Sequence, residues 1–175
     1  MILIPYVEAN GFRTIPDDEL VEIFDRIILE GLDRIVFYSG NVRTARDFIF
    51  VMKSQNNLPV FVRDKDGYVG FAWLNNLNGN NAMPHFCFFK GRRGELAIEA
   101  GKKILQYWFS FPGEGGPLFD VLVGMVPDFN TRAIEFVKKL GAIELGSIPK
   151  LAYNGFTQGK HGMTMLYYLR EQHGT

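Results

Sequence analysis

The stretch Pro127–Gly146, "PDFNTRAIEFVKKLGAIELG", carries the clearest fold signal in the chain. Asn130 precedes an amphipathic run with helical spacing, and Gly141 follows the run. Asn is a preferred helix N-cap, and Gly is preferred just past a helix end. The apolar run at 118–126 predicts a buried strand in front of this helix. We therefore expect a strand, then a helix over 131–140, then the start of another strand.

Upstream of this stretch, helical and strand patterns follow one another. Acidic residues after Pro16 and apolar residues at helical spacing up to Gly31 predict a first helix, with Thr14 placed to cap it. The sequence "DKDG" at 64–67 joins two β-rich runs and predicts a hairpin turn. The expected elements are strands at 3–9, 60–63, 68–74, 82–89, 118–126, 142–146 and 162–169, and helices at 14–31, 42–52, 96–108 and 131–140.

The order of these elements predicts an α/β (α+β) fold in one domain over residues 1–175. Strand–helix–strand units around an antiparallel three-strand meander give a mixed, mostly antiparallel, twisted sheet. We expect about six to seven strands, flanked on both faces by about four helices. Pro5 favours an edge position for the first strand, because proline cannot donate to a central ladder.

The composition narrows the class of partner. Lysine plus arginine and aspartate plus glutamate both number 19, so no basic field is present to attract nucleic acid or an anionic membrane surface. A small-molecule or protein partner is expected instead. No apolar run is long enough to cross a membrane, no signal-peptide pattern is present, and the single Cys87 suits a reducing compartment. These features predict a cytoplasmic protein, with the oligomeric state open and a homodimer as one option.

Six residues of the opening stretch match a family pattern: Asn130, Ala133, Ile134, Phe136, Leu140 and Gly141. Together with the order of elements, they resemble the GCN5-related N-acetyltransferase (GNAT) superfamily. The resemblance implies that the protein binds acetyl-CoA and transfers its acetyl group to a primary amine of a small molecule or protein. The alternatives are a non-catalytic CoA-binding or protein-interaction module with the same fold, or an unrelated α/β binding protein.

A second segment, "FFKGRRGELAIEAGKKIL" at 88–105, resembles the phosphate loop of this superfamily. There the pattern Arg/Gln-x-x-Gly-x-Gly/Ala turns backbone N–H groups and a helix N-terminus toward the pyrophosphate of acetyl-CoA. Glu95 occupies the middle position where the pattern has glycine, and Gly94 comes one residue early. A solvated basic turn that only begins a helix is the alternative. The resemblance implies cofactor contacts at Arg92, Arg93, Gly94, Glu95, Leu96 and Ala97.

The resemblance also implies a place for the pantetheine arm. In the superfamily, the strands expected here at 84–89 and 119–126 splay apart, and the arm hydrogen-bonds into the gap like an added strand. Asn130 would also hold the arm, although a plain N-cap explains this residue equally well. The implied contacts are the backbone near Phe86, Cys87 and Phe88, with Asn130 and Ala133 on the following helix.

His85 is the candidate catalytic base. The resemblance places it in a strand where family members often have a base, and histidine titrates near neutrality. A histidine satisfied in or near the core is the equally weighted alternative. Val137 stands where many members have a tyrosine that protonates the leaving thiolate, and valine cannot donate a proton. A water, no specific acid, or another tyrosine would then serve; the candidates are Tyr153, Tyr167 and Tyr168.

Two further chemistries are not expected. Cys87 lies among phenylalanines with no histidine visibly paired to it, which is typical of a small core residue rather than an acyl-carrying nucleophile. His161 and His173 are separated by too many residues, with no carboxylate at ligand spacing, to indicate a metal site. The resemblance thus implies acetyl-CoA as cosubstrate, and the residue pattern predicts no metal.

Overall fold

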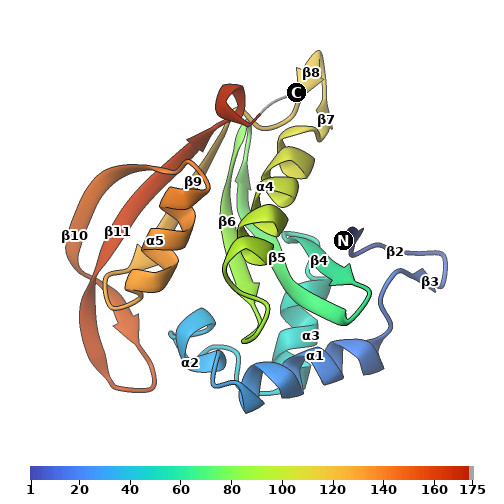
Figure 1. Cartoon of the computed structure of the whole chain (residues 1–175), viewed down its shortest axis with the longest axis horizontal. Helices are drawn as coiled ribbons and strands as arrows, with labels where there is room; N and C mark the ends of the chain where they lie inside the picture. Colours follow the sequence, from blue (N-terminus) through green and yellow to red (C-terminus); the bar gives the residue numbers. More distant parts are fainter. Residues whose placement is uncertain (174–175) are drawn as a thin grey trace.

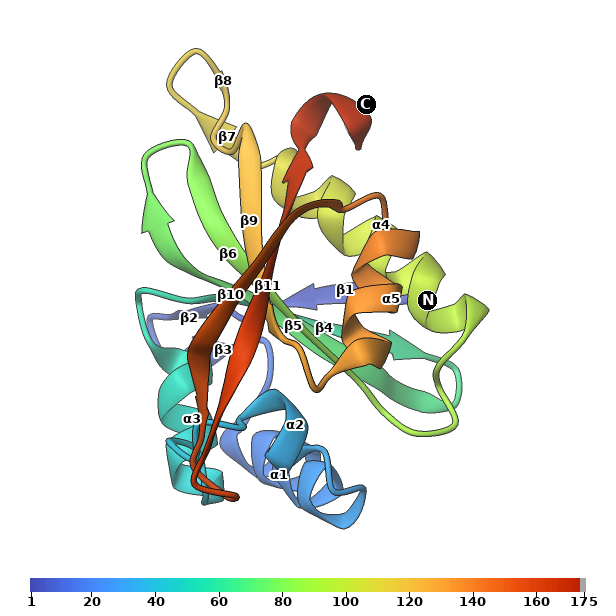
Figure 2. The same cartoon turned by 90° about the vertical axis from the view of Figure 1, so that its left-hand side faces the viewer.

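The computed structural model describes residues 1–173. Seven strands form one twisted sheet in the order β1-β4-β5-β6-β9-β11-β10, and helices cover both faces (Figure 1, Figure 2). Neighbouring strands run antiparallel except β6 and β9, which run parallel. The predicted mixed, mostly antiparallel α/β sheet is confirmed, and β1 occupies the edge position that Pro5 favours.

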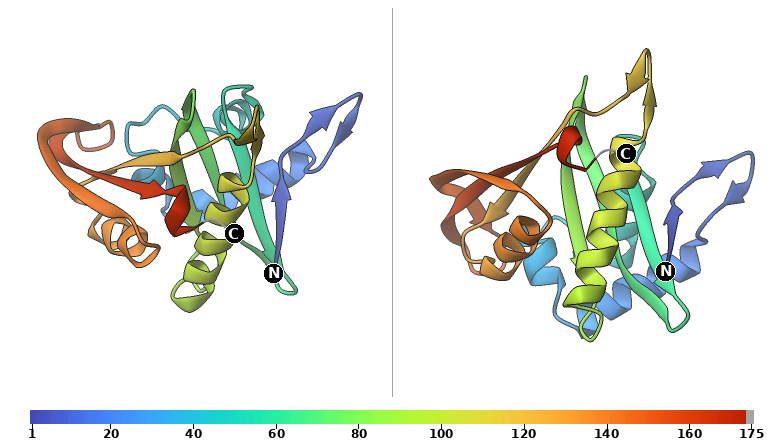
Figure 3. Two further views of the ribbon diagram at one scale, coloured as in Figure 1. Left: turned by 90° about the horizontal axis from the view of Figure 1, so that it is seen from above. Right: turned by 45° about the horizontal axis from the view of Figure 1, so that its top comes forward.

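The elements have the following bounds. The main strands are β1 (Ile2–Pro5), β4 (Leu58–Asp64), β5 (Gly67–Asn78), β6 (Asn81–Phe88), β9 (Val121–Pro127), β10 (Ile143–Asn154) and β11 (Gly159–Leu169). The helices are α1 (Asp17–Leu29), α2 (Asp33–Val36), α3 (Ala45–Lys53), α4 (Glu95–Phe109) and α5 (Thr131–Lys139), with a 3-10 turn at Arg170–Gln172. Two small hairpins stand away from the body, β2 (Glu8–Ala9) with β3 (Phe12–Arg13) and β7 (Pro112–Gly113) with β8 (Gly116–Pro117) (Figure 3).

The sheet separates two hydrophobic cores. Helices α4 and α5 pack on one face around Trp108, while α1, α3 and the α2 segment pack on the other around Phe48. Successive residues of a strand point to opposite faces, so β6 contributes to both cores. Phe86 and Phe88 pack with the α4–α5 core, and Cys87 packs with the α1–α3 core. This strand therefore presents side chains to both faces of the sheet.

The helix ends follow their local sequence. The side chain of Asn130 accepts a hydrogen bond from the backbone N–H of Ala133 at 3.3 Å, which confirms the predicted N-cap of α5. Helix α1 ends before Gly31, whose φ of 64° is left-handed. Helices α4 and α5 approach closely at Gly101, where a Cβ atom would lie 2.6 Å from Leu140 Cδ1. Any larger residue there would push the two helices apart.

The N-terminal predictions need two corrections. Thr14 does not cap α1, because Pro16 is the N-cap residue and makes no side-chain cap bond. The Thr14 hydroxyl instead donates to the Pro5 carbonyl at 2.7 Å and accepts from Val7 N–H at 3.0 Å. The expected strand over 3–9 is split for the same reason: β1 ends at Pro5, and the chain then enters the β2–β3 hairpin, which Thr14 closes.

Two other elements differ from expectation. Strand β10 runs to Asn154, well beyond the predicted end at 146. Register shifts lie between Glu144 and Gly146 and between Ile148 and Ala152, so the period of two that identifies a strand is broken twice. Helix α2 was not expected, because a helix of 4 residues is too short to show apolar periodicity.

Candidate functional site

A cavity opens where strands β6 and β9 diverge. Their parallel pairing is confined to Asn81↔Val121 and Ala82↔Leu122, after which the strands separate. Figure 1 shows the two strands spreading apart between α4 and α5. A cavity of about 840 Å³ occupies the region and is lined by both strands together with α2, α4 and α5. A volume of this size is ordinary for a small-molecule or cofactor site.

The cavity reaches both faces of the sheet. Phe86 and Phe88 line it on the face covered by α4 and α5. His85, Cys87 and Trp73 line it from the opposite face, where α1 and α2 lie. Figure 2 shows the two sets of helices on opposite faces of the sheet. A molecule bound on one face can therefore meet a second molecule that enters from the other.

The peptide groups of β6 alternate between its two neighbours. Phe89 N–H donates to the Val69 carbonyl at 3.1 Å, which makes this register pair a hydrogen-bonded one. Hydrogen-bonded pairs recur at every second residue of an antiparallel ladder, so Cys87 turns its peptide group toward β5. The peptide groups of Phe86 and Phe88 turn toward the gap. Of the three predicted contacts, Cys87 thus lines the cavity with its side chain and not with its backbone.

The N-terminus of α4 opens onto this cavity. Gly94 is its N-cap residue, with φ 76° and no side-chain cap bond. The first hydrogen bond of the helix runs from Ile98 N–H to the Gly94 carbonyl at 3.1 Å, so the N–H groups before Ile98 have no helical acceptor. Gly94, Glu95 and Ala97 line the cavity. Free N–H donors and the positive end of the helix dipole make this end of the cavity suited to phosphate.

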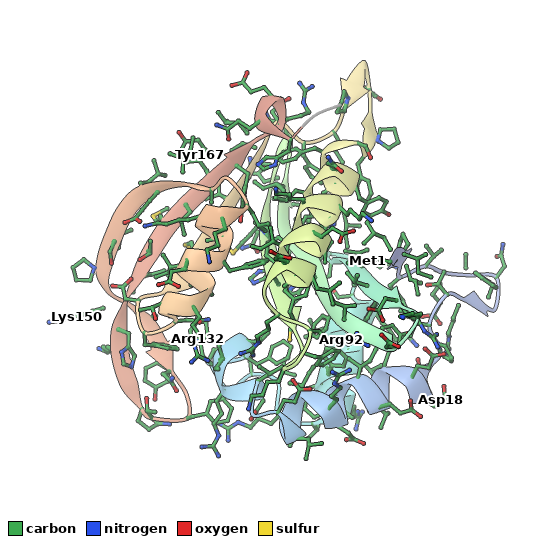
Figure 4. The ribbon with its side chains drawn as sticks, in the orientation of Figure 1. Met1, Asp18, Arg92, Arg132, Lys150 and Tyr167 are labelled. Carbon is green, nitrogen blue, oxygen red and sulfur yellow. The ribbon has the colours of Figure 1, made fainter. Side chains whose placement is uncertain are left out.

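The two adjacent arginines of the loop differ. Arg93 lines the cavity, and its Nε donates to the Phe88 carbonyl at 3.4 Å. Arg92 does not line it: the Arg92 guanidinium pairs with Asp64 at 3.1 Å and Asp66 at 3.6 Å in the β4–β5 turn. In Figure 4, Arg92 lies toward that turn, whereas Arg132 lies at the N-terminal end of α5. Leu96, another predicted contact, does not line the cavity either, because its side chain packs on the α4–α5 core.

Cations that the sequence reasoning missed line the same side of the cavity. They are Lys102 on α4 and Arg132 and Lys139 on α5. Three carboxylates, Glu95, Glu99 and Glu135, share this side. Lys102 lies seven residues after Glu95, two helical turns along the same face of α4. The helical spacing of Glu95 and Lys102 could have been found in the sequence. Which residues of α5 face them across the cavity could not.

Asn130 and Ala133, at the start of α5, both line the cavity. The Asn130 side-chain oxygen serves as the N-cap acceptor, as described above. Its NH₂ group has no hydrogen-bond partner within residues 1–173. Capping and ligand binding therefore use different atoms of the same side chain.

His85 is held by a stack and by one hydrogen bond. Its ring lies on the Trp73 ring with 4.5 Å between centroids and 8° between planes, and its Nε2 is 3.0 Å from Asn75 Oδ1. Since an amide oxygen only accepts, the Nε2 atom carries the proton and Nδ1 keeps a lone pair. Burial lowers the pKa of His85 to about 4. The imidazole is therefore neutral near pH 7.

A tyrosine not singled out from the sequence, Tyr38, lines the cavity. It follows α2, packs edge-on against Phe129 with 5.8 Å between centroids, and accepts a hydrogen bond at its carbonyl from Gly155 N–H at 2.8 Å. Burial raises the pKa of Tyr38. Its hydroxyl makes no hydrogen bond within the part of the chain that the structure describes. The contact with Gly155 joins distant parts of the chain, so no local pattern marks this residue.

The tyrosines considered from the sequence lie elsewhere. Val137 lines the cavity at the position where the family pattern has tyrosine. Tyr168 is buried behind it and donates to the Val137 carbonyl at 3.5 Å, and burial raises its pKa. Tyr153 is hydrogen-bonded to Gln158 on the β10–β11 hairpin. Neither these two nor Tyr167 lines the cavity.

Other chemistries find no support at this site. Cys87 is 2% exposed, and burial raises the pKa of its thiol to about 12, so a reactive thiolate is not available near neutral pH. Across residues 1–173 no group of three or more His, Cys, Asp or Glu side chains is arranged to hold a metal ion. None of the helices in the described range is long and apolar enough to cross a membrane.

Comparisons with known proteins agree with this geometry. No family profile and no curated protein matches the sequence significantly. Among solved structures, spermidine N-acetyltransferase from Vibrio cholerae in complex with CoA and spermine aligns with TM-score 0.72 and 13% identity, covering 98% of this chain and 97% of that one. Ribosomal-protein-S5-alanine acetyltransferase from Vibrio fischeri aligns with TM-score 0.69 and 11% identity, covering 91% and 92%. The chain therefore has the fold of the GCN5-related N-acetyltransferase superfamily.

Proposed function

We propose that this protein is an N-acetyltransferase that moves an acetyl group from acetyl-CoA to a primary amine of a small molecule or a protein. The observation that carries the proposal is the cavity between β6 and β9, which crosses the sheet and meets the free N-terminus of α4. The fold match to N-acetyltransferases, one of them bound to CoA, supports the same activity. We also propose a cytoplasmic location; like a homodimeric state, it rests on the sequence alone.

The α4–α5 side of the cavity suits the CoA moiety. The N–H groups from Gly94 to Ala97 are free to bind phosphate oxygens, and the cations of Arg93 and Lys102 add positive charge. The peptide group of Phe86 and the N–H of Phe88 face the gap and can pair with the amides of the pantetheine arm, as an added strand would, while the Phe88 carbonyl accepts from Arg93. Glu95 carries negative charge in this region and weakens the phosphate site without removing its N–H donors.

The chemistry is a direct transfer. The amine nitrogen attacks the thioester carbonyl carbon, the carbon–sulfur bond breaks, CoA leaves as a thiolate, and the amine gives up a proton. The buried Cys87 thiol does not supply an acyl-enzyme step. His85 is neutral, and its Nδ1 lone pair can accept a hydrogen bond from the amine; because burial disfavours the imidazolium, His85 is a weak base. Tyr38 is the cavity hydroxyl available to protonate the thiolate.

A second candidate function is a non-catalytic module that binds CoA. Val137 in place of the usual tyrosine is the observation that favours it. Tyr38 weakens this alternative, because it supplies a hydroxyl to the same cavity from a different element. The two functions differ in one measurable product, free CoA thiol.

The test has two steps. Calorimetry of the full chain with acetyl-CoA should give a Kd well below a millimolar, and a thiol-release assay over a panel of primary amines should then give amine-dependent turnover. Lys102→Ala should weaken acetyl-CoA binding several-fold, because Lys102 lines the cavity. Lys160→Ala is the control, since Lys160 is exposed on β11 and does not line the cavity. Binding without thiol release for any amine would favour the non-catalytic module.

A further inference from the structure

The α2 side of the cavity is built from apolar and aromatic side chains. It comprises Leu32, Ile35, Val36, Tyr38, Trp73 and His85. Phe37 stacks on Trp73 with 5.8 Å between centroids, and Trp73 stacks in turn on His85 at 4.5 Å. This row of rings forms a rigid wall, because each ring is fixed by the next. Phe129, 38% exposed, packs edge-on against Tyr38 and extends the aromatic surface outward.

Charge is absent from this α2 side. The charged residues that line the cavity are Arg93, Glu95, Glu99, Lys102, Arg132, Glu135 and Lys139. All of them belong to α4, to α5 or to the loop before α4. His85 is neutral near pH 7, because burial lowers its pKa to about 4. The cavity is thus charged where phosphates would bind and uncharged on the opposite face of the sheet.

The carboxylates near the α2 side already have other partners or line another pocket. Asp128 accepts hydrogen bonds from the hydroxyls of Thr164 and Ser147, each at 2.7 Å. Asp33 and Glu30 line a separate surface pocket, and Glu30 also pairs with Arg26 at 2.8 Å. A polycation placed against the α2 side would bury ammonium groups without a counter-charge, which is costly.

We propose that the acceptor is a primary amine carried by an apolar or aromatic group, with one amine and no further charge, and that it binds on the α2 side of the cavity. The inference rests on the proposed function and names its acceptor class. This acceptor class differs from spermine, the polyamine bound in the structure of the Vibrio cholerae fold neighbour.

The same surface helps the chemistry. An ammonium group that leaves water for an apolar wall has its pKa lowered, which raises the fraction of neutral, nucleophilic amine. The Tyr38 hydroxyl and His85 Nδ1 are the polar atoms available on this side to orient one amine. A second or third amine along the same molecule would find no polar partner among the side chains of the α2 side.

The experiment compares kcat/KM for 2-phenylethylamine, spermidine and alaninamide, measured by thiol release with saturating acetyl-CoA. We expect 2-phenylethylamine to exceed both polar amines by about tenfold or more. Ile35→Glu places a carboxylate in the α2 side, at a position 41% exposed. This variant should lower the ratio of 2-phenylethylamine to spermidine at least tenfold.

Ile28→Glu is the matched control. Ile28 is 44% exposed on α1 and does not line the cavity, so this variant adds the same charge and should keep the wild-type ratio within about twofold. Both variants should keep the wild-type affinity for acetyl-CoA. A wild-type preference for spermidine or alaninamide, or equal changes in the two variants, would overturn the inference and leave the proposed function standing.

If no amine of the panel is turned over, a binding measurement tests the inference instead. Calorimetry of the protein–CoA complex should then show 2-phenylethylamine binding at least tenfold more tightly than spermidine, and equal or absent binding would overturn the inference. A failure of acetyl-CoA itself to bind would instead refute the proposed function, and the acceptor class with it.

Discussion

The His85 ring stacks on the Trp73 ring with 4.5 Å between centroids and 8° between planes, on the side of the sheet opposite α4. The stack and the hydrogen bond to Asn75 fix the imidazole at the edge of the cavity. They also keep it out of water, so its charged form is disfavoured.

This burial gives His85 a signature in the pH dependence of stability. Its pKa is about 4 in the folded protein and near 6.5 unfolded. The unfolded chain therefore binds a proton between these values that the folded chain does not, and stability falls as pH falls through this window. His85→Gln should show a smaller loss of Tm than wild type between pH 7 and pH 4.5. An unchanged loss of Tm would show that His85 is not buried as described.

Two glycines of the loop before α4 provide a matched test of the phosphate site. Gly91 and Gly94 both have φ 76°, and a Cβ at either would meet no atom within 4 Å. Changing either to alanine should cost about 1 kcal/mol of stability, because a left-handed backbone disfavours a side chain. Only Gly94 lines the cavity. Gly94→Ala should therefore weaken acetyl-CoA binding in calorimetry, whereas Gly91→Ala should not; similar affinities would argue against the site.

Tyr38→Phe tests the source of the proton for the leaving thiolate. We expect kcat to fall by about 100-fold, the lower end for general acid catalysis, with little change in the KM for acetyl-CoA. Tyr153→Phe is the control, because Tyr153 is 46% exposed and lies outside the cavity. Equal kcat values in wild type and Tyr38→Phe would show that Tyr38 does not protonate the leaving thiolate and that solvent does.

Gly155→Ala tests how Tyr38 is held. A Cβ at Gly155 would overlap the Ser39 carbonyl oxygen, and Gly155 N–H donates to the Tyr38 carbonyl at 2.8 Å. The substitution should cost about 1–3 kcal/mol in urea unfolding and lower kcat as Tyr38 shifts. Gly124→Ala, where the nearest atom to a Cβ is 3.9 Å away, should cost less. The reverse order of stabilities would contradict the packing described here.

The predictable parts of the structure depend on local signals. Asn130 and Gly141 mark the ends of α5, and the structure has the helix where these two residues place it. The strand expected at 82–89 likewise matches β6, which lines the cavity. The cap assigned to Thr14 was wrong, because its hydroxyl bonds to Pro5, nine residues away, and this contact is not encoded in a capping pattern.

The rest depends on contacts between distant residues. Arg92 and Arg93 are equivalent in the sequence, and the carboxylate of Asp64 in the β4–β5 turn decides which of them leaves the cavity. Tyr38 reaches the cavity because the tip of the β10–β11 hairpin holds its carbonyl. Neither relation has a signature in composition or periodicity, since both join separate elements.

The central claim is that acetyl-CoA binds between β6 and β9 with its phosphates at the N-terminus of α4. Hydrogen exchange of the full chain, with and without saturating acetyl-CoA, tests it most directly. We predict slower exchange in peptides covering 84–89 and 94–98, which hold the free N–H groups, and no change in the β2–β3 hairpin. Unchanged exchange in both peptides, or protection confined to other parts of the chain, would contradict the claim.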